Sequence, residues 1–263
     1  MKRSLLVLLL VGLTACGAAP TTVDETQNWS AEKIYNTAMD ELHVGNYSKS
    51  VKLFETLEAR YPYGRFAQQA QLEVAYAYYK DNEAVSAVAA CDRFIKLHPN
   101  SPDIDYVYYL KGLANFPQDK NLLSVLANQD ITERDPSSAI SSFNAFHELT
   151  TRFPDSKYTP DALARMKYLV DMLGWHEIHI AHYYYSRQAY IAAINRVQYS
   201  LMHYPQAPAN EQGLSIMVRS YDAMKMPGMR DDAQRILQKN FPNSQYLKGN
   251  LDPTKPWWQF WTL

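Results

Sequence analysis

The chain has 263 residues and is almost neutral, with 26 Lys and Arg against 27 Asp and Glu. It lacks the basic surplus typical of nucleic-acid binding, so we expect no nucleic-acid partner. Tyrosine is frequent, at 20 residues, and glycine is scarce, at 9, which favours helices with amphipathic aromatic surfaces over a turn-rich β protein.

The N-terminus has the form of a bacterial lipoprotein signal. Two basic residues precede an apolar run that is too short to span a bilayer as a helix. Residues 13–16 (LTAC) then match the lipobox pattern, so we predict that the signal peptide 1–15 is removed and Cys16 is lipidated. That covalent lipid is the only non-protein group we expect, and it would hold the protein at a membrane. Gly17, in place of aspartate, favours the outer membrane.

Residues 16–29 show no periodicity and few large apolar groups, which indicates a lipidated N-terminus and flexible tether. The fold is predicted to begin at Ser30, a suitable N-cap. From there an aromatic or imidazole residue followed by proline recurs, which is a repeat signature. The pairs are Tyr61-Pro62, His98-Pro99, Phe153-Pro154, Tyr204-Pro205 and Phe241-Pro242.

Small residues lie twelve and twenty-four positions before three of these prolines: Ala38 and Ser50, Ala75 and Ala87, Ala181 and Ala193. This spacing predicts tetratricopeptide units, in which small side chains let two antiparallel helices approach and proline ends the second helix. The fold class is therefore an all-α tetratricopeptide array of about five repeats. Second helices are expected to begin at Tyr47 and Tyr190, and Cys91 is expected to be a small buried core residue.

Longer spacings between prolines indicate insertions in repeats three and four. We predict an N-terminal half at 30–115, an insertion loop at 116–135 and a C-terminal half at 136–247. In the fourth repeat, residues 159–187 are compatible with one long helix or with two helices broken at Gly174. The last repeat is degenerate around residues 226–228, as terminal units often are.

Motifs for catalysis or metal binding are weak. His176, His179 and His182 are spaced so that the third has rotated away from the first on a helix, and they do not match the zincin motif. We therefore predict no metal site. There is no glycine-rich phosphate loop or nucleophile elbow, so we predict that the chain is not an enzyme and has no catalytic residues.

Tyrosines gather on the predicted first helices, which line the concave groove in tetratricopeptide arrays. Most are expected to pack between helices, and the rest could hold an extended peptide. The C-terminal tail, 248–263, contains four large aromatic residues after two prolines. Burial in the same protein or a partner, and insertion at a bilayer interface, remain open for this tail.

Five segments together resemble one known family, the BamD (ComL) family of outer-membrane β-barrel assembly lipoproteins. The resemblance covers residues 34–246 and is carried by residues 60–64 (RYPYG), 69–80 (QAQLEVAYAYYK), 92–115, 134–136 (RDP) and 187–197 (RQAYIAAINRV). It implies a lipid-tethered periplasmic array in the BAM complex, with BamA, other BAM lipoproteins and unfolded outer-membrane proteins as partners.

By this resemblance, the N-terminal repeats would bind unfolded clients or accessory lipoproteins, and the C-terminal repeats would dock on the POTRA domains of BamA. The candidate groove residues are Arg60, Tyr63, Tyr76, Tyr79, Tyr106 and Tyr109. The candidate BamA contacts are Arg187, Asn195 and Arg196, the alternative for Arg196 being an ordinary solvated helix arginine.

The predicted function is therefore a non-catalytic scaffold for insertion of proteins into the outer membrane, lipid-anchored at its periplasmic face. One alternative is a periplasmic tetratricopeptide lipoprotein for pilus or peptidoglycan-related assembly. The other alternative is an enzyme of the cell wall, but the sequence contains no set of catalytic residues that would support it.

Overall fold

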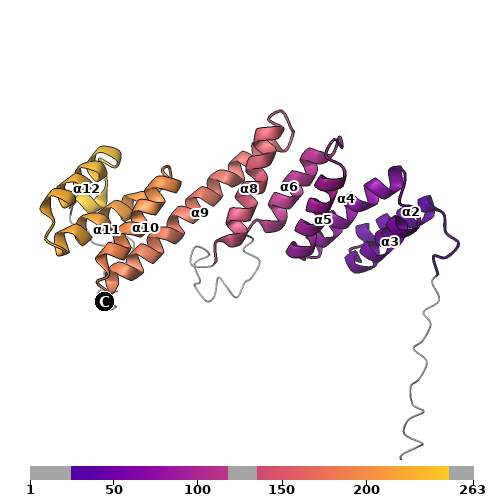
Figure 1. Ribbon diagram of the computed structural model, residues 1–263, viewed down its shortest axis with the longest axis horizontal. Coiled ribbons are helices and arrows are strands. Elements are labelled where there is room, and N and C mark those ends of the chain that lie inside the picture. Colours follow the sequence, from indigo (N-terminus) through magenta and orange to yellow (C-terminus); the bar gives the residue numbers. More distant parts are fainter. Residues whose placement is uncertain (1–24, 118–134, 249–263) are drawn as a thin grey trace, which may run out of the picture. The chain divides into compact units, whose positions relative to one another are not determined.

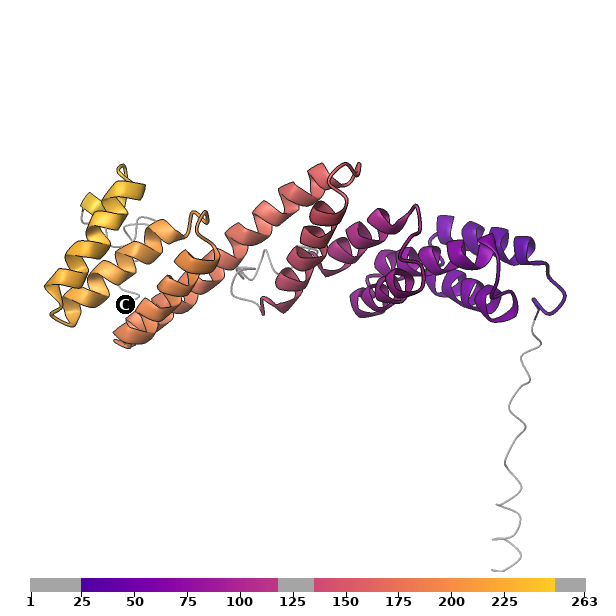
Figure 2. The same cartoon turned by 45° about the horizontal axis from the view of Figure 1, so that its top comes forward.

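The computed structural model describes residues 25–117 and 135–248, and this part of the chain is helical without any strand (Figures 1 and 2). Its α-helices are α2 (Ala31–His43), α3 (Tyr47–Arg60), α4 (Arg65–Lys80), α5 (Ala84–Leu97), α6 (Ile104–Asn115), α8 (Ser137–Arg152), α9 (Thr159–Ser186), α10 (Tyr190–His203), α11 (Asn210–Ala223) and α12 (Pro227–Asn240), followed by the short 3-10 helix η3 (Gln245–Lys248). The all-α prediction is confirmed. The signal peptide, Cys16, most of the predicted insertion loop and nearly all of the C-terminal tail lie outside the described residues.

The chain forms two compact units, residues 1–70 and 71–263, which divide within α4. The sequence places the division elsewhere, at 116–135. Helices α6 and α8, on either side of that insertion, pack directly against each other, so both belong to the second unit. The hydroxyl of Ser142 on α8 donates a hydrogen bond of 2.8 Å to the carbonyl of Gly112 on α6.

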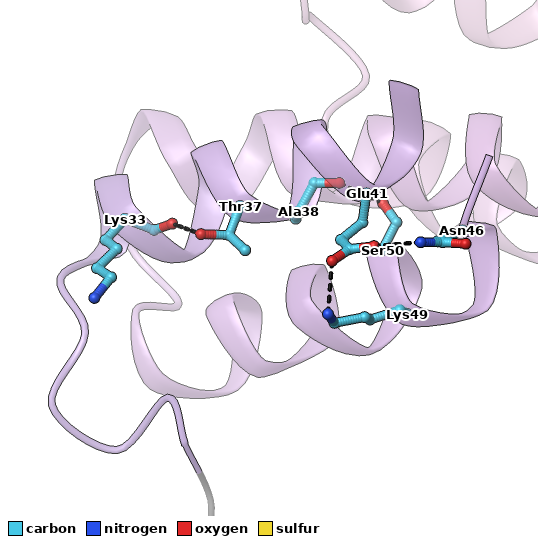
Figure 3. A network of polar contacts seen from close by, with 7 residues as sticks. All are labelled: Lys33, Thr37, Ala38, Glu41, Asn46, Lys49 and Ser50. Carbon is cyan, nitrogen blue, oxygen red and sulfur yellow. Dashed lines mark hydrogen bonds and ion pairs between the residues drawn. The ribbon is translucent and has the colours of Figure 1, made fainter. Parts of the chain in front are cut away.

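In the first unit, α2 and α3 form a hairpin whose crossing is built from small residues. Ser30 caps α2 as predicted, accepting a hydrogen bond from the Lys33 amide. Ala38 and Ser50 are both fully buried, and the Ser50 hydroxyl donates to the Ala38 carbonyl at 2.8 Å (Figure 3). The serine therefore gives a close crossing and satisfies its own buried hydroxyl.

A polar network fixes the turn between α2 and α3 (Figure 3). Glu41 accepts from Lys49 at 2.6 Å and from Asn46 at 2.7 Å. These two hydrogen bonds hold the pKa of Glu41 below its ordinary value. The network joins the last turn of α2 to the first turn of α3.

The same backbone turn occurs inside four helical hairpins. At each, one residue has a positive φ between 58° and 86°, and the next amide donates to the carbonyl five residues back, as in a Schellman motif. The positive-φ residues are Gly45, Asn82, Gln188 and Lys225. The segment around residues 226–228, degenerate in sequence, thus enters α12 through the same turn as the regular units.

The aromatic–proline pairs end helices as predicted. Each of the five aromatic or imidazole residues is the C-cap of its helix, with φ near −130°. Each donates its amide to the carbonyl four residues back at 2.7–2.8 Å. Proline then directs the chain toward the next helix.

The six small crossing residues predicted from the spacing are all fully buried, which confirms the tetratricopeptide register. Cys91 is also fully buried, and burial raises the pKa of its thiol to about 12. The prediction that Cys91 is a core residue is confirmed. Tyr47 and Tyr190 begin α3 and α10 as expected.

Of the two possibilities for residues 159–187, the structure has one continuous helix, α9, of 28 residues. Gly174 does not interrupt it. A Cβ at this position would lie 2.4 Å from Cβ of Ala207, in the linker before α11. Glycine is needed here because the helix and the linker approach closely.

Candidate functional site

Half-buried tyrosines from α4, α6 and the segment before α9 meet in the second unit. We call this set, Tyr76, Tyr79, Tyr106, Tyr109 and Tyr158, the tyrosine cluster. Tyr158 is central: its ring stacks on Tyr109 at 4.8 Å between centroids and lies 5.4 Å from Tyr106. Tyr76 lies 6.4 Å from Tyr79. Burial, with Tyr76 as a neighbour, raises the pKa of Tyr106, so its hydroxyl stays protonated and can donate hydrogen bonds.

At one side of the tyrosine cluster, Tyr109 contacts an ion pair on α9, formed by Asp161 and Arg165. The Tyr109 hydroxyl donates to Oδ2 of Asp161 at 2.7 Å, and Nε of Arg165 donates to the same oxygen at 2.5 Å. Partial burial alone would raise the pKa of Asp161, but these two hydrogen bonds outweigh it and lower the pKa. The sequence places four of the five tyrosines in a candidate groove but misses Tyr158, Asp161 and Arg165.

Replacing Asp161 with asparagine is expected to destabilise the protein slightly at neutral pH and not at low pH. The pKa of Asp161 is below its ordinary value of 3.8, so its stabilisation is complete above that value and is lost as the pH falls through the folded-state pKa. Because the carboxylate is about half exposed, the loss at pH 7 should stay below about 1 kcal/mol. Melting temperatures at pH 7, 5 and 3 measure it.

Asp155→Asn, on the exposed linker before α9, is the control for this substitution and should follow the parent at every pH. A difference between Asp161→Asn and the parent that persists unchanged at pH 3 would contradict the role of the carboxylate.

The other two predicted groove residues belong to the first unit. Arg60 is used by the fold, because its guanidinium donates to the carbonyl of Thr26 near the N-terminus of the described chain. The structure therefore does not place Arg60 as a groove residue. The sequence does not reveal the contact between Arg60 and Thr26, because the acceptor is a backbone carbonyl 34 residues away. Tyr63 is 93% exposed. After the other aromatic–proline pairs the matching position is polar, namely Asn100, Asp155, Gln206 and Asn243.

The predicted docking residues lie at the end of α9 and on α10. Arg187 follows α9 and is exposed, its guanidinium 5.4 Å from the Tyr183 ring. Along α10, four exposed residues at helical spacing form one face, which we call the α10 face: Ile191, Asn195, Tyr199 and Met202. Ile191 is 67% exposed and Met202 73%. A helix with apolar side chains on its outer face presents a surface suited to a protein partner.

Arg196 is 42% exposed and also forms an ion pair within the fold. Its guanidinium lies 3.2 Å from Oε2 of Glu177 on α9, and the Glu177 side chain is only 10% exposed. A glutamate at position 196 would place a second carboxylate beside a buried one. Charge reversal at Arg196 therefore perturbs the fold as well as any partner contact, and Asn195 and the α10 face are cleaner probes.

The histidines of α9 do not assemble a metal site in the described ranges: no group of three or more His, Cys, Asp or Glu is placed there to hold an ion. His179 instead packs beside Trp175, with ring centroids 5.9 Å apart. Among the described helices, none is long and apolar enough to cross a membrane.

Comparison with known proteins decides the family. The family model described as an outer membrane lipoprotein, YfiO, matches residues 27–236. The chain belongs to this family. The relatives similar to this chain are named BamD. The relative from Neisseria meningitidis serogroup B, an "Outer membrane protein assembly factor BamD", is 47% identical over 99% of this chain and 100% of its own length. The relatives of the same name from Neisseria gonorrhoeae (45% identical, 99% and 100% coverage) and Xylella fastidiosa strain Temecula1 (34%, 86% and 77%) agree.

The BamD family match includes the tyrosine cluster, Tyr63 and the α10 face, since all lie within residues 27–236. The resemblance inferred from the five sequence segments is confirmed, as is the tetratricopeptide-like helical repeat fold. The chain is an outer membrane protein assembly factor of the BamD type.

Proposed function

We propose that this protein acts within the BAM complex as a non-catalytic scaffold, lipid-anchored through Cys16 to the periplasmic face of the outer membrane. It binds the POTRA domains of BamA and other BAM lipoproteins, and it holds unfolded outer-membrane proteins before their insertion. The observation that carries the proposal is the similarity to proteins named BamD over 99% of the chain, because a match of that extent includes every candidate surface.

The tyrosine cluster is the proposed client site of the second unit. Its rings are half-buried, so they are held in place by packing and still offer apolar edges and hydroxyl donors. Such a surface suits an extended, aromatic-rich segment of an unfolded β-barrel strand. In the first unit, Tyr63 is the candidate client contact, since it places an exposed aromatic ring where the other linkers carry polar residues.

The α10 face with Arg187 is the proposed BamA docking surface. The apolar side chains of Ile191, Tyr199 and Met202 supply area that loses water on binding, and Asn195 supplies hydrogen bonds. The guanidinium of Arg187 suits a carboxylate on the partner. Binding at this surface is therefore expected to combine a buried apolar centre with a charged edge.

No catalytic step is proposed, and no cofactor besides the lipid on Cys16. The one cysteine in the described ranges, Cys91, has a fully buried thiol whose pKa is raised to about 12, so it remains protonated at neutral pH. The scaffold acts through differences in affinity between partners.

Affinity capture of the full chain from detergent-solubilised outer membranes tests this function. BamA and the other BAM lipoproteins are expected among the captured proteins. The purified Cys16→Ala chain should not bind lipid vesicles, and its helical content should be unchanged, as measured by circular dichroism. Absence of BamA would overturn the proposal, and recovery of pilus or peptidoglycan assembly proteins in its place would favour the alternative scaffold.

A further inference from the structure

The segment just before α2 is attached to the C-terminal end of α3. Residues 25–28 form a turn, closed by a 3.0 Å hydrogen bond from the Trp29 amide to the Thr26 carbonyl. Arg60, the last residue of α3, donates through its guanidinium to the Thr26 carbonyl. The next residue, Tyr61, donates its hydroxyl to the Trp29 carbonyl at 2.8 Å. Two side chains separated from their acceptors by more than thirty residues thus hold two carbonyls of the N-terminal segment, at Thr26 and Trp29.

The Trp29 side chain strengthens this attachment. Its ring is partly buried, and Nζ of Lys33, on the first turn of α2, lies 4.4 Å from the ring centroid. The cation–π contact ties Trp29 to α2, whereas Tyr61 ties it to the end of α3. We call Thr26, Trp29, Lys33, Arg60 and Tyr61 together the tether clamp.

We propose that the tether clamp sets the working length of the lipid tether, by fixing the chain at Thr26 instead of at Ser30, where α2 is capped. This inference rests on the proposed lipidation of Cys16. Thr26 is ten positions after Cys16 in the sequence, and Ser30 is fourteen positions after it. At full extension these lengths span about 35 Å and about 50 Å. The clamp therefore shortens the maximum distance between the membrane surface and the first unit by roughly 15 Å.

The tether clamp also determines which helices bear tension that is applied through the tether. Without it, tension would act on the first turn of α2, where the Ser30 hydroxyl accepts a 3.2 Å hydrogen bond from the Lys33 amide. With it, tension is shared between α2 and the end of α3, two helices that are packed along their length. A helix terminus frays easily because its end groups lack intrahelical partners, so moving the load away from it protects α2.

The effect of the clamp on tether length can be tested by combining a deletion that shortens the tether with substitutions that open the clamp and lengthen it. Deleting residues 19–22 shortens the tether by four residues. Opening the clamp moves the point of attachment from Thr26 to Ser30, which lengthens the tether by the same four residues. The clamp is opened by Arg60→Met and Tyr61→Phe together, which remove the donors and keep most of the packing volume. Tyr47→Phe, which removes a tyrosine hydroxyl elsewhere in the first unit, is the matched control.

Each full-length chain is tested as the sole copy in cells, and the readout is the amount of folded β-barrel protein in the outer membrane. We expect the deletion to lower that amount at least twofold, and the open clamp, but not Tyr47→Phe, to restore it. In the purified full-length chain, amide hydrogen exchange at Trp29, whose amide donates to the Thr26 carbonyl, should rise at least tenfold when the clamp is opened. Faster exchange without rescue of the deletion would overturn the inference.

Two outcomes separate this inference from the function on which it rests. If Cys16→Ala assembles β-barrels normally, the lipid-anchor proposal fails, and the length of the tether has no role. If Cys16→Ala lowers β-barrel assembly but deletion of residues 19–22 has no effect, anchoring stands and the role of the clamp in setting tether length is overturned.

Discussion

Replacing Gly174 with alanine is expected to destabilise the protein by about 2 kcal/mol and to lower its melting temperature by roughly 4–8 °C. The added Cβ would lie 2.4 Å from Cβ of Ala207, whereas carbon atoms normally approach to about 3.5–4.0 Å. Neither methyl group can rotate away, because each is attached directly to the backbone. Helix α9 and the linker before α11 must therefore separate.

A second effect acts in the opposite direction. Alanine is favoured over glycine inside a helix by about 1 kcal/mol, so without the close approach this substitution would stabilise α9. Overpacking of a close contact costs about 1–3 kcal/mol, occasionally more, and a contact between two fixed methyl groups belongs at the upper end. The sign of the measured change thus reports whether the close approach exists.

Gly228→Ala is the matched control. Gly228 lies in the first turn of α12, and a Cβ there would meet nothing within 4 Å. This variant should keep or slightly raise the melting temperature, measured by thermal denaturation followed by circular dichroism. If Gly174→Ala behaved like Gly228→Ala, the contact between α9 and the linker would be wrong.

The features that the sequence predicted well are those that depend on local chemistry repeated along the chain. Proline after an aromatic residue ends a helix by its own covalent geometry, and all five such pairs are C-caps in the structure. Buried small residues recur with the same period in the hairpins α2–α3, α4–α5 and α9–α10, because these three share the same crossing. A repeated local constraint is visible in sequence even when single positions vary.

The positive-φ turns show the opposite case. Gly45 and Asn82 are residue types that favour this conformation, while Gln188 and Lys225 adopt it without any such signal. The Schellman hydrogen bonds and the packed hairpin impose the conformation on them. Tertiary context, not local preference, thus determines the turns at Gln188 and Lys225.

The parts of the candidate sites that sequence reasoning missed are contacts between distant segments. Asp161 meets Tyr109 from 52 positions away, and Arg196 pairs with Glu177 on another helix. The crossing of Gly112 with Ser142 was hidden for a related reason, since the insertion between them breaks the regular spacing of twelve residues. No periodicity links such residues before the helices are placed.

Replacing Ile191 with aspartate is expected to weaken capture of BamA by about 30-fold or more without unfolding the domain. Ile191 is 67% exposed at the start of the α10 face, so its side chain contributes little to the core. A charge within the apolar part of the α10 face loses the buried area and must also be desolvated on binding. A loss of about 2 kcal/mol, the size found for the strongest contacts of an interface, corresponds to about that change in affinity.

Val85→Asp is the matched control for this surface substitution. Val85 is 86% exposed on α5, so the same charge is added to a β-branched residue that is equally outside the core. Both variants should keep the parent melting temperature to within about 2 °C, since exposed substitutions rarely change stability by more than about 0.5 kcal/mol. Only Ile191→Asp should lose BamA in the capture experiment.

Arg187→Ala is expected to act differently at the same surface, because its guanidinium lies at the charged edge of the proposed interface. Removing a rim charge chiefly slows association and reduces its dependence on salt, whereas an aspartate at Ile191 should chiefly speed dissociation. Binding kinetics of the purified proteins at 50 and 300 mM salt distinguish the two effects. Unchanged kinetics for both variants would place the BamA contact away from the α10 face while leaving the family assignment intact.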